Sequence, residues 1–323
     1  MTMKDPPFAI TNKTLTLTTE IAELVGKVTS TETLSTNPVL RRTNRIKSIY
    51  SSLAIEQNSL TLDQVTAVLS GKRVLAPPKD IKEVRNAYEI YERLDQLDPY
   101  SIDDLLLAHQ VMTKDLVPES GAFRSGAIGV VDQKGNVLHF GSLPAYVPQL
   151  VCELLEWTKQ SDLPILIKSC IFHYEFELIH PFADGNGRVG RLWHTLLLSK
   201  WNPIFAWLPV ESIIHDRQED YYRAFNQSNE MGASTVFIEY MLSAIKSALE
   251  EIVETSSLRS PKCDLRWEKI QSFLNHQTII MNADVRALFD VSSATANRIL
   301  AGFCSEGKLQ KVRVGKYWGY QKA

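Results

Sequence analysis

Residues 180–191 combine several residue types that act on phosphate groups in proteins. The segment reads His-Pro-Phe-Ala-Asp-Gly-Asn-Gly-Arg-Val-Gly-Arg and follows a strongly apolar stretch. Pro181 cannot continue a preceding helix in the regular way. The turn after it is built of small residues, Gly185, Asn186 and Gly187. Glycine lets backbone N–H groups come close to a ligand, and a helix beginning here would present free N–H groups and a partial positive charge to an anion.

Four side chains of this segment could take part in the chemistry. Arg188 and Arg191 are three residues apart, so in a helix both project from one side of the first turn, where their guanidinium groups match phosphate oxygens. Asp184 is a hard oxygen ligand of the kind that holds Mg²⁺ together with substrate phosphates. His180 can take up a proton near neutral pH. Each feature alone is common in structural roles, but their combination predicts a site for phosphoryl or nucleotidyl transfer.

The segment resembles the signature of the Fic family, H-P-F-x-[D/E]-G-N-G-R-x-x-R, at every fixed position. The resemblance extends over residues 40–245 and includes the approach at 172–179 and the later Tyr-Tyr-Arg-Ala-Phe element at 221–225. It implies a helical domain that transfers AMP from ATP to a Ser, Thr or Tyr hydroxyl of a target protein, with Mg²⁺ as cofactor. Transfer of another group, such as UMP, phosphate or phosphocholine, stays open, as does a DNA-binding regulator that uses nucleotide only as a signal.

The resemblance also implies roles for individual residues. His180 would deprotonate the target hydroxyl, Asp184 would hold Mg²⁺, and Arg188 and Arg191 would bind phosphates, Arg191 the γ-phosphate. Asn186 and Gly187 would form the anion hole. The full set implied for nucleotide binding is Asp184, Gly185, Asn186, Gly187, Arg188, Arg191, Val137, Leu138, His139, Tyr221, Tyr222 and Asn229. His173 shares a helix face with His180, and a structural role is expected for it.

Residues 51–58 resemble the inhibitory helix of the same family, [S/T]-x-x-x-E-[G/N]. Ser52 and Glu56 match this pattern, whereas Gln57 replaces the usual Gly or Asn. The resemblance implies that Glu56 pairs with Arg191, removes a γ-phosphate anchor and leaves ATP misaligned for attack, and such misplacement strongly reduces rates. The alternative is that Glu56 is an ordinary surface residue of an amphipathic helix. Its position before the catalytic segment favours the inhibitory role.

Hydrophobic periodicity predicts the elements that position this segment. Helices are expected over residues 11–60, 79–97, 100–117, 147–159, 163–178, 189–201, 217–229 and 234–254, with Thr61 and Ser101 as helix caps. β-forming residues at 128–131 and 137–140 flank a polar turn and predict a β-hairpin. The resemblance equates the hairpin at 127–140 with a flap that pairs with an extended segment of the target protein.

The last sixty or so residues differ from the rest in charge. Residues 261–323 hold ten Lys/Arg and five Asp/Glu, a net charge of +5 on an otherwise acidic chain. Helices are expected at 265–274, 282–289 and 293–304 and strands at 309–314 and 317–320, which is the pattern of a winged helix. Nucleic-acid binding and protein contact are equally favoured by this pattern.

The composition of the chain indicates the class of protein and where it is expected to reside. The chain has 323 residues, of which 44% are hydrophobic and 22% charged, as in globular proteins. Four scattered cysteines and the absence of a long apolar run favour a cytoplasmic protein without membrane contact. The expected fold is mainly α, a Fic-type helical bundle with a β-hairpin flap, followed by a small winged-helix domain. The expected parts are an N-terminal helical region (1–100) with the inhibitory helix near 45–58, a catalytic core (101–254), a linker (255–262) and the winged-helix-like domain (263–323). A homodimer is left open.

Overall fold

The computed structural model describes residues 5–30, 34, 37–131, 137–257, 261–315 and 317–323. For residues 130–131, 137–140, 255–257, 261–264 and 305 it describes the backbone only. The chain divides into two compact units, residues 1–27 with 44–250, and residues 28–43 with 251–323.

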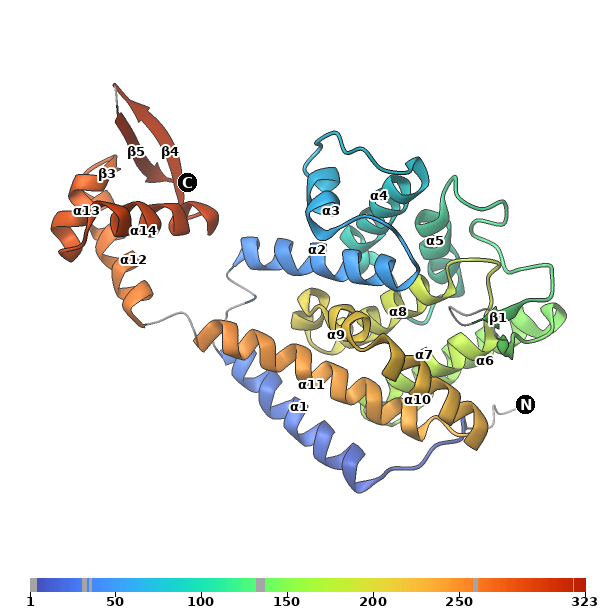
Figure 1. The fold of residues 1–323 in the computed structure, drawn as a ribbon. Helices are drawn as coiled ribbons and strands as arrows, with labels where there is room; N and C mark the ends of the chain where they lie inside the picture. Colours follow the sequence, from blue (N-terminus) through green and yellow to red (C-terminus); the bar gives the residue numbers. More distant parts are fainter. Residues whose placement is uncertain (1–4, 31–33, 35–36, 132–136, 258–260, 316) are drawn as a thin grey trace. The chain divides into compact units, whose positions relative to one another are not determined.

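The first part of the chain is almost entirely helical, which confirms the predicted mainly α fold (Figure 1). Its elements are α1 (Asn12–Ser30), α2 (Pro38–Ile55), α3 (Leu62–Leu69), α4 (Pro78–Glu92), the 3-10 helix η1 (Leu94–Gln96), α5 (Ile102–Thr113), β1 (Gly129–Val131), β2 (Val137–Phe140), η2 (Pro144–Tyr146), α6 (Val147–Gln160), α7 (Ile165–Ile179), α8 (Asn186–Trp201), η3 (Pro203–Trp207), α9 (Val210–Asp216), α10 (Gln218–Met231) and α11 (Thr235–Ser257).

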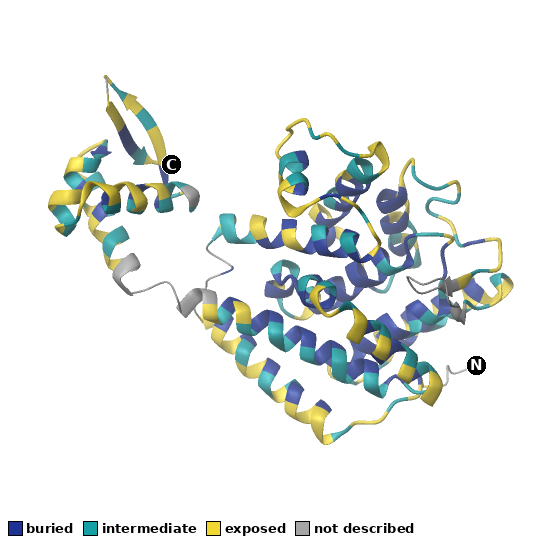
Figure 2. Ribbon diagram, viewed as in Figure 1, coloured by how far each residue is buried: buried dark blue, intermediate teal, exposed yellow. Residues whose placement is uncertain are grey.

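Helices α7 and α8 form the centre of the larger unit, and buried residues gather along both (Figure 2). As its apolar sequence predicts, α7 is buried on nearly every side, including His173 and Phe176. Helices α1 and α11 lie side by side and are joined by ion pairs between Lys13 and Glu239 at 3.1 Å and between Lys246 and Glu20 at 2.9 Å. Because α7 and α8 are both buried, the loop between them is held by the core of the larger unit.

Two predicted helix caps are confirmed, and several boundaries differ from the predictions. Thr61 accepts a hydrogen bond from the backbone of Gln64 in a capping box, and Ser101 accepts one from Asp104. The helix expected over 79–97 is α4 followed by the separate turn η1, and α9 was not predicted. At seven residues, α9 is too short to show a clear helical period.

The predicted hairpin consists of β1 and β2, which pair antiparallel with Gly129 opposite Phe140. An irregularity follows Val130, so that Val131 pairs with Val137. The predicted turn at 132–136 lies outside the described residues. The backbone of Val137, Leu138 and His139 is thus in a strand, and their side chains are not described.

The smaller unit contains α12 (Pro261–Leu274), β3 (Ile280–Met281), α13 (Asn282–Phe289), α14 (Ser293–Ser305), β4 (Leu309–Val314) and β5 (Tyr317–Lys322). The strands form one antiparallel sheet in the order β3-β5-β4. The two-residue β3 was not predicted, because a strand this short carries no readable alternation. A common core joins helices and sheet through Ile270, Ile280, Val285, Ala296, Leu300, Phe303, Leu309 and Tyr320.

The expected linker at 255–262 overlaps the end of α11 and the start of α12. Residues 258–260 lie outside the described part, so the linker stays a prediction. The expected boundary at residue 100, between the N-terminal helical region and the catalytic core, lies inside the larger unit, which contains residues from both sides of it. No helix in the described residues is long and apolar enough to cross a membrane.

Candidate active site

The loop between α7 and α8 has left-handed backbone at both of its ends. His180, which caps α7, has φ 51°, and Gly185, before α8, has φ 89°. Helix α8 begins three residues earlier than predicted, at Asn186. Its first intrahelical bond runs from the Val189 N–H to the Gly185 carbonyl at 3.0 Å. The N–H groups of residues 186–188 lie ahead of the helix's own hydrogen bonds, where an anion can bind.

The buried Asn186 side chain shapes this loop from within. Its Oδ1 accepts a hydrogen bond from the Phe182 N–H, and its Nδ2 donates one to the Phe182 carbonyl, each at 2.8 Å. The anion-hole role expected for Asn186 would therefore fall to its backbone N–H, because the side-chain amide already bonds the loop.

His109 of α5 supports the loop from outside, and sequence reasoning missed it. Its Nδ1 accepts from the Gly121 N–H at 3.0 Å, so Nε2 donates to the Asp184 carbonyl, also at 3.0 Å. The imidazole stacks on Phe182 with ring centroids 3.7 Å apart and planes 3° apart. Burial lowers the pKa of His109 to about 4, so this ring is neutral at pH 7 and fixes the loop.

Arg124 joins the loop to the segments that flank the hairpin, and it too was missed. The side chain is 3% exposed. Its Nε donates to the His180 carbonyl at 2.7 Å and its Nη1 to the Gly126 carbonyl at 2.7 Å. Nη2 donates to the carbonyls of Ser142 and Ile179. One guanidinium therefore ties the backbone of the expected base to the chain on both sides of β1 and β2.

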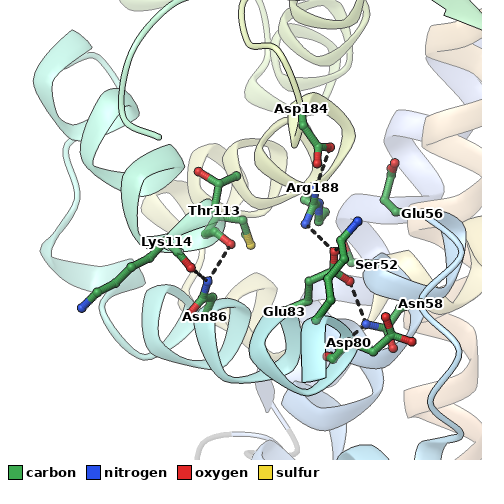
Figure 3. Close-up of polar contacts among 12 residues, drawn as sticks. Ser52, Glu56, Asn58, Asp80, Glu83, Asn86, Thr113, Lys114, Asp184 and Arg188 are labelled. Carbon is green, nitrogen blue, oxygen red and sulfur yellow. Dashed lines mark hydrogen bonds and ion pairs between the residues drawn. The ribbon is translucent and has the colours of Figure 1, made fainter. Parts of the chain in front are cut away.

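Arg188 is almost completely buried and is paired with two carboxylates (Figure 3). Its Nη2 lies 2.7 Å from Asp184 Oδ1, and its Nη1 lies 3.4 Å from Glu83 Oε1 on α4. The Asp184 side chain is 44% exposed, so it faces solvent as well as Arg188. Glu83 lies about a hundred residues earlier in the chain, and no local motif signals it.

Arg191 is paired with the helix end whose sequence resembles the inhibitory helix of the family. Its Nη2 contacts Glu56 Oε1 at 2.7 Å and the Ser52 carbonyl at 2.9 Å, and its Nε donates to the Ser52 hydroxyl at 3.0 Å. Burial by itself lowers the pKa of Arg191, but the Glu56 carboxylate, together with Tyr221 and Glu177, outweighs it and raises the pKa. A Cβ at position 187 would collide with Glu56 Oε1 and approach Arg191, so a side chain there would displace the Glu56 carboxylate from this position.

Glu177 is a further acid next to the expected base. Its Oε2 lies 4.0 Å from His180 Nδ1 and its Oε1 lies 3.8 Å from His173 Nε2. Burial raises the pKa of Glu177 to about 8, so the carboxyl group is mostly protonated at pH 7. His180 Nδ1 also lies 3.3 Å from the Glu177 carbonyl. If Nδ1 donates there, Nε2 is the basic nitrogen of His180.

The remaining predicted nucleotide-binding residues lie on α10 and β2. Tyr221 is buried, and its hydroxyl lies 3.2 Å from Nε2 of His173, which supports the structural role expected for that histidine. The Tyr222 hydroxyl accepts from Gln218 at 3.4 Å. Asn229, two turns farther along α10, accepts from the Tyr174 hydroxyl at 2.8 Å.

Asp184 has the properties needed to bind Mg²⁺. Burial works to raise its pKa, but the positive charge of Arg188 and hydrogen bonds from Arg188 and Gly185 outweigh it and lower the pKa. The group is therefore an anion at pH 7. Among the described residues, no three His, Cys, Asp or Glu side chains are grouped to hold a metal. A cation here would thus be held by one carboxylate together with substrate phosphates and water, as is usual for Mg²⁺.

Comparisons with known proteins agree with this site. The sequence model of the Fic/DOC family matches residues 99–198. Protein adenylyltransferase fic-1 of Caenorhabditis elegans is 29% identical over 220 residues, 64% of this chain and 40% of the relative. Protein adenylyltransferase Fic of Nematostella vectensis is 27% identical over 222 residues, 65% of this chain and 49% of the relative. The chain thus spans less than half the length of these two relatives.

A solved structure matches along the whole chain. The crystal structure of a Fic family protein from Desulfovibrio desulfuricans G20 has a TM-score of 0.77 and 39% sequence identity to this chain. The match covers 99% of this chain and 98% of that one, so it includes the loop, the helix end that carries Glu56 and the smaller unit. The chain belongs to the Fic family.

Proposed function

We propose that this protein is a protein adenylyltransferase that moves AMP from ATP to a Ser, Thr or Tyr hydroxyl of a target protein. The observation that carries the proposal is the ordered loop, in which His180, Asp184, Arg188 and the start of α8 are fixed by hydrogen bonds and an ion pair. The names of the two curated relatives support AMP as the transferred group.

In the proposed reaction, His180 Nε2 takes the proton of the target hydroxyl as the hydroxyl oxygen attacks the α-phosphorus of ATP. A new oxygen–phosphorus bond forms, the bond from the α-phosphorus to the bridging oxygen breaks, and pyrophosphate leaves. The N–H groups of residues 186–188 and the Arg188 guanidinium stabilise the negative charge that develops. Mg²⁺ held by Asp184 would neutralise phosphate charge.

We further propose that the enzyme is autoinhibited through Glu56. The 2.7 Å ion pair occupies an edge of the Arg191 guanidinium that a γ-phosphate would otherwise bind. Glu56 is also next to the Cα of Gly187, close to the expected anion hole. Nucleotide would then bind without its γ-phosphate anchor, and the α-phosphate would be misaligned for attack.

The hairpin is the proposed docking site for the target protein. Strands β1 and β2 pair only with each other among the described residues, which leaves an edge for an added strand. Arg124 connects the chain at both ends of this hairpin to the His180 carbonyl. A target segment added here would lie near the base, and Val137, Leu138 and His139 stay proposed contacts of the nucleotide.

The smaller unit is a proposed winged helix that binds duplex DNA. A three-residue turn, 290–292, joins α13 to α14, as in helix-turn-helix motifs. Arg298 is exposed on α14. On the sheet, Lys311 and Arg313 lie over the ring of Trp318 at 4.5 and 5.1 Å, which gives a basic and aromatic surface. This function is independent of nucleotide transfer.

The nucleotide-transfer proposal is tested by incubating the Glu56→Gly variant with Mg²⁺ and each nucleoside triphosphate, labelled at the α- or γ-phosphate. We expect label on protein from α-labelled ATP and none from γ-labelled ATP. Label retained from the γ-phosphate would show phosphoryl transfer, and preference for UTP would show UMP transfer. Absence of label from every nucleotide would overturn the enzyme proposal.

DNA binding is tested with the full chain and a fluorescent duplex at increasing salt. We expect affinity that falls steeply with salt and is lost when Lys311 and Arg313 are changed to Glu. Changing the exposed Lys269 of α12 to Glu is the matched control. Equal binding by all three proteins would refute the assigned surface on β4 and β5. No binding by the parent would refute this second function and leave protein contact as the alternative.

A further inference from the structure

Glu83 holds Arg188 on the side away from Asp184. It is a buried residue of α4, 7% exposed, and its Oε1 lies 3.4 Å from Arg188 Nη1 (Figure 3). The Asp184 oxygen contacts the other terminal nitrogen, Nη2. If Asp184 turns to a metal ion, Glu83 remains to fix the guanidinium plane, with the Nη2 edge directed to the phosphates.

Glu83 in turn is held by Asn58, which follows Glu56 by two residues. Asn58 Nδ2 donates to Glu83 Oε2 at 2.8 Å and to the Asp80 carbonyl at 3.1 Å. The backbone N–H of Asn58 donates to the Leu53 carbonyl at 3.1 Å, so this residue is part of the end of α2. Its position therefore depends on the same helix end that presents Glu56 to Arg191.

These contacts form a continuous path from Asn58 through Glu83 to Arg188. We propose that Glu83 is a positioning residue for Arg188, and that Asn58 couples it to the inhibitory helix. The inference rests on the proposed function, because it assigns Arg188 to the reacting phosphates. It implies that the end of α2 acts on both arginines of the loop, on Arg191 directly through Glu56 and on Arg188 through Glu83.

Exchanging the carboxylate of Glu83 and the amide of Asn58 between the two positions gives a specific test. Glu83→Gln has one acceptor oxygen for two donors, so either Arg188 or Asn58 loses its partner. Asn58→Asp alone places a carboxylate against Glu83. In the double variant, the glutamine on α4 can accept from Arg188 and donate its amide to the aspartate at the end of α2, and the total charge of the pair is preserved. Loss of the Asp80 contact is common to the single and double Asn58 variants.

The variants are compared in the Glu56→Gly background, so that direct inhibition of Arg191 is absent. We expect Glu83→Gln to lower kcat for AMP transfer about tenfold and to raise KM for ATP, because one charge-assisted hydrogen bond is lost. The double variant should recover to within about threefold of the background, in the range of a retained neutral hydrogen bond. Glu89→Gln, on the same helix with a side chain that is 44% exposed, is the matched control.

Two results would overturn the proposal. One is unchanged kcat and KM in Glu83→Gln with an unchanged melting temperature, and the other is losses in the double variant that multiply instead of cancelling. If the background protein transfers no nucleotide, the proposed function fails, but calorimetric binding of Mg²⁺-ATP still tests positioning. Affinity should fall in Glu83→Gln and recover in the double variant, and equal affinity in all variants would refute the inference.

Discussion

Gln57, the residue after Glu56, holds a backbone conformation that favours glycine. Its φ is 66°, in the left-handed region. The Gln57 N–H donates to the Ala54 carbonyl at 3.0 Å and the Asn58 N–H donates to the Leu53 carbonyl at 3.1 Å. This is the Schellman arrangement that ends many helices, in which the left-handed position is usually Gly and sometimes Asn. Gly or Asn, the residues of the family pattern, suits this position, whereas Gln places a Cβ in the left-handed region.

The strain sets the size of the expected effect. A left-handed residue with a Cβ costs roughly 1–2 kcal/mol relative to its right-handed form. If the strain is relieved when the helix end releases Glu56, Gln57→Gly stabilises the inhibited state by about 1 kcal/mol. That corresponds to about fivefold less released enzyme. Gln57→Val should act in the opposite direction, because a β-branched side chain is least tolerated at positive φ.

The assay is the initial rate of self-labelling with α-labelled ATP in the otherwise unchanged protein. We expect Gln57→Gly to label about fivefold more slowly and Gln57→Val to label faster than the parent. Asp290→Gly makes the same backbone relief in the smaller unit, where φ is 48°, and should leave the rate unchanged. Equal rates for both Gln57 variants and the parent, or faster labelling by Gln57→Gly, would refute the link between helix-end strain and inhibition.

Buried groups around the loop give two further predictions. Arg124→Lys leaves one side-chain nitrogen in place of a guanidinium group that donates to four carbonyls. We expect it to lower kcat on the order of 100-fold in the Glu56→Gly background. Single-turnover transfer measures this, and an unchanged kcat would contradict it. For Glu177, burial raises the pKa from 4.5 to about 8, so the folded protein keeps a proton that the unfolded chain releases as pH rises through that window. The contribution of Glu177 to the free energy of unfolding should therefore fall as the pH rises from 4.5 to 8. The melting temperature of Glu177→Gln should rise relative to that of the parent over this pH window and not below it. A constant difference between the two proteins at all pH values would exclude the assigned pKa.

The chemistry of the loop could be predicted from the sequence because its groups are contiguous. His180, Asp184 and both arginines lie within one turn and one helix start, so local rules of capping and spacing apply. The pairing of Glu56 with Arg191 was expected from the family pattern, and the contact is present at 2.7 Å. Whether this contact inhibits the enzyme stays a prediction.

The residues that support the loop could not be predicted in the same way. His109, Arg124 and Glu83 lie 56 or more positions from their partners in the loop. Nothing in their local sequence distinguishes them from surface polar residues. Only tertiary packing brings α4 with Glu83, α5 with His109 and the segment before β1 with Arg124 to the loop. The start of α8 at Asn186 was also misplaced, because a left-handed Gly185 lets the helix begin within the motif.

In the proposed function, the loop transfers AMP and Glu56 inhibits this transfer. The most direct measurement is intact-protein mass spectrometry of the parent, Glu56→Gly and Glu56→Gly/His180→Ala after incubation with ATP and Mg²⁺. We expect mass gains of one or more AMP groups on Glu56→Gly, much less on the parent, and none on the double variant. Equal modification of parent and Glu56→Gly would contradict autoinhibition, and modification that persists without His180 would contradict the assigned base.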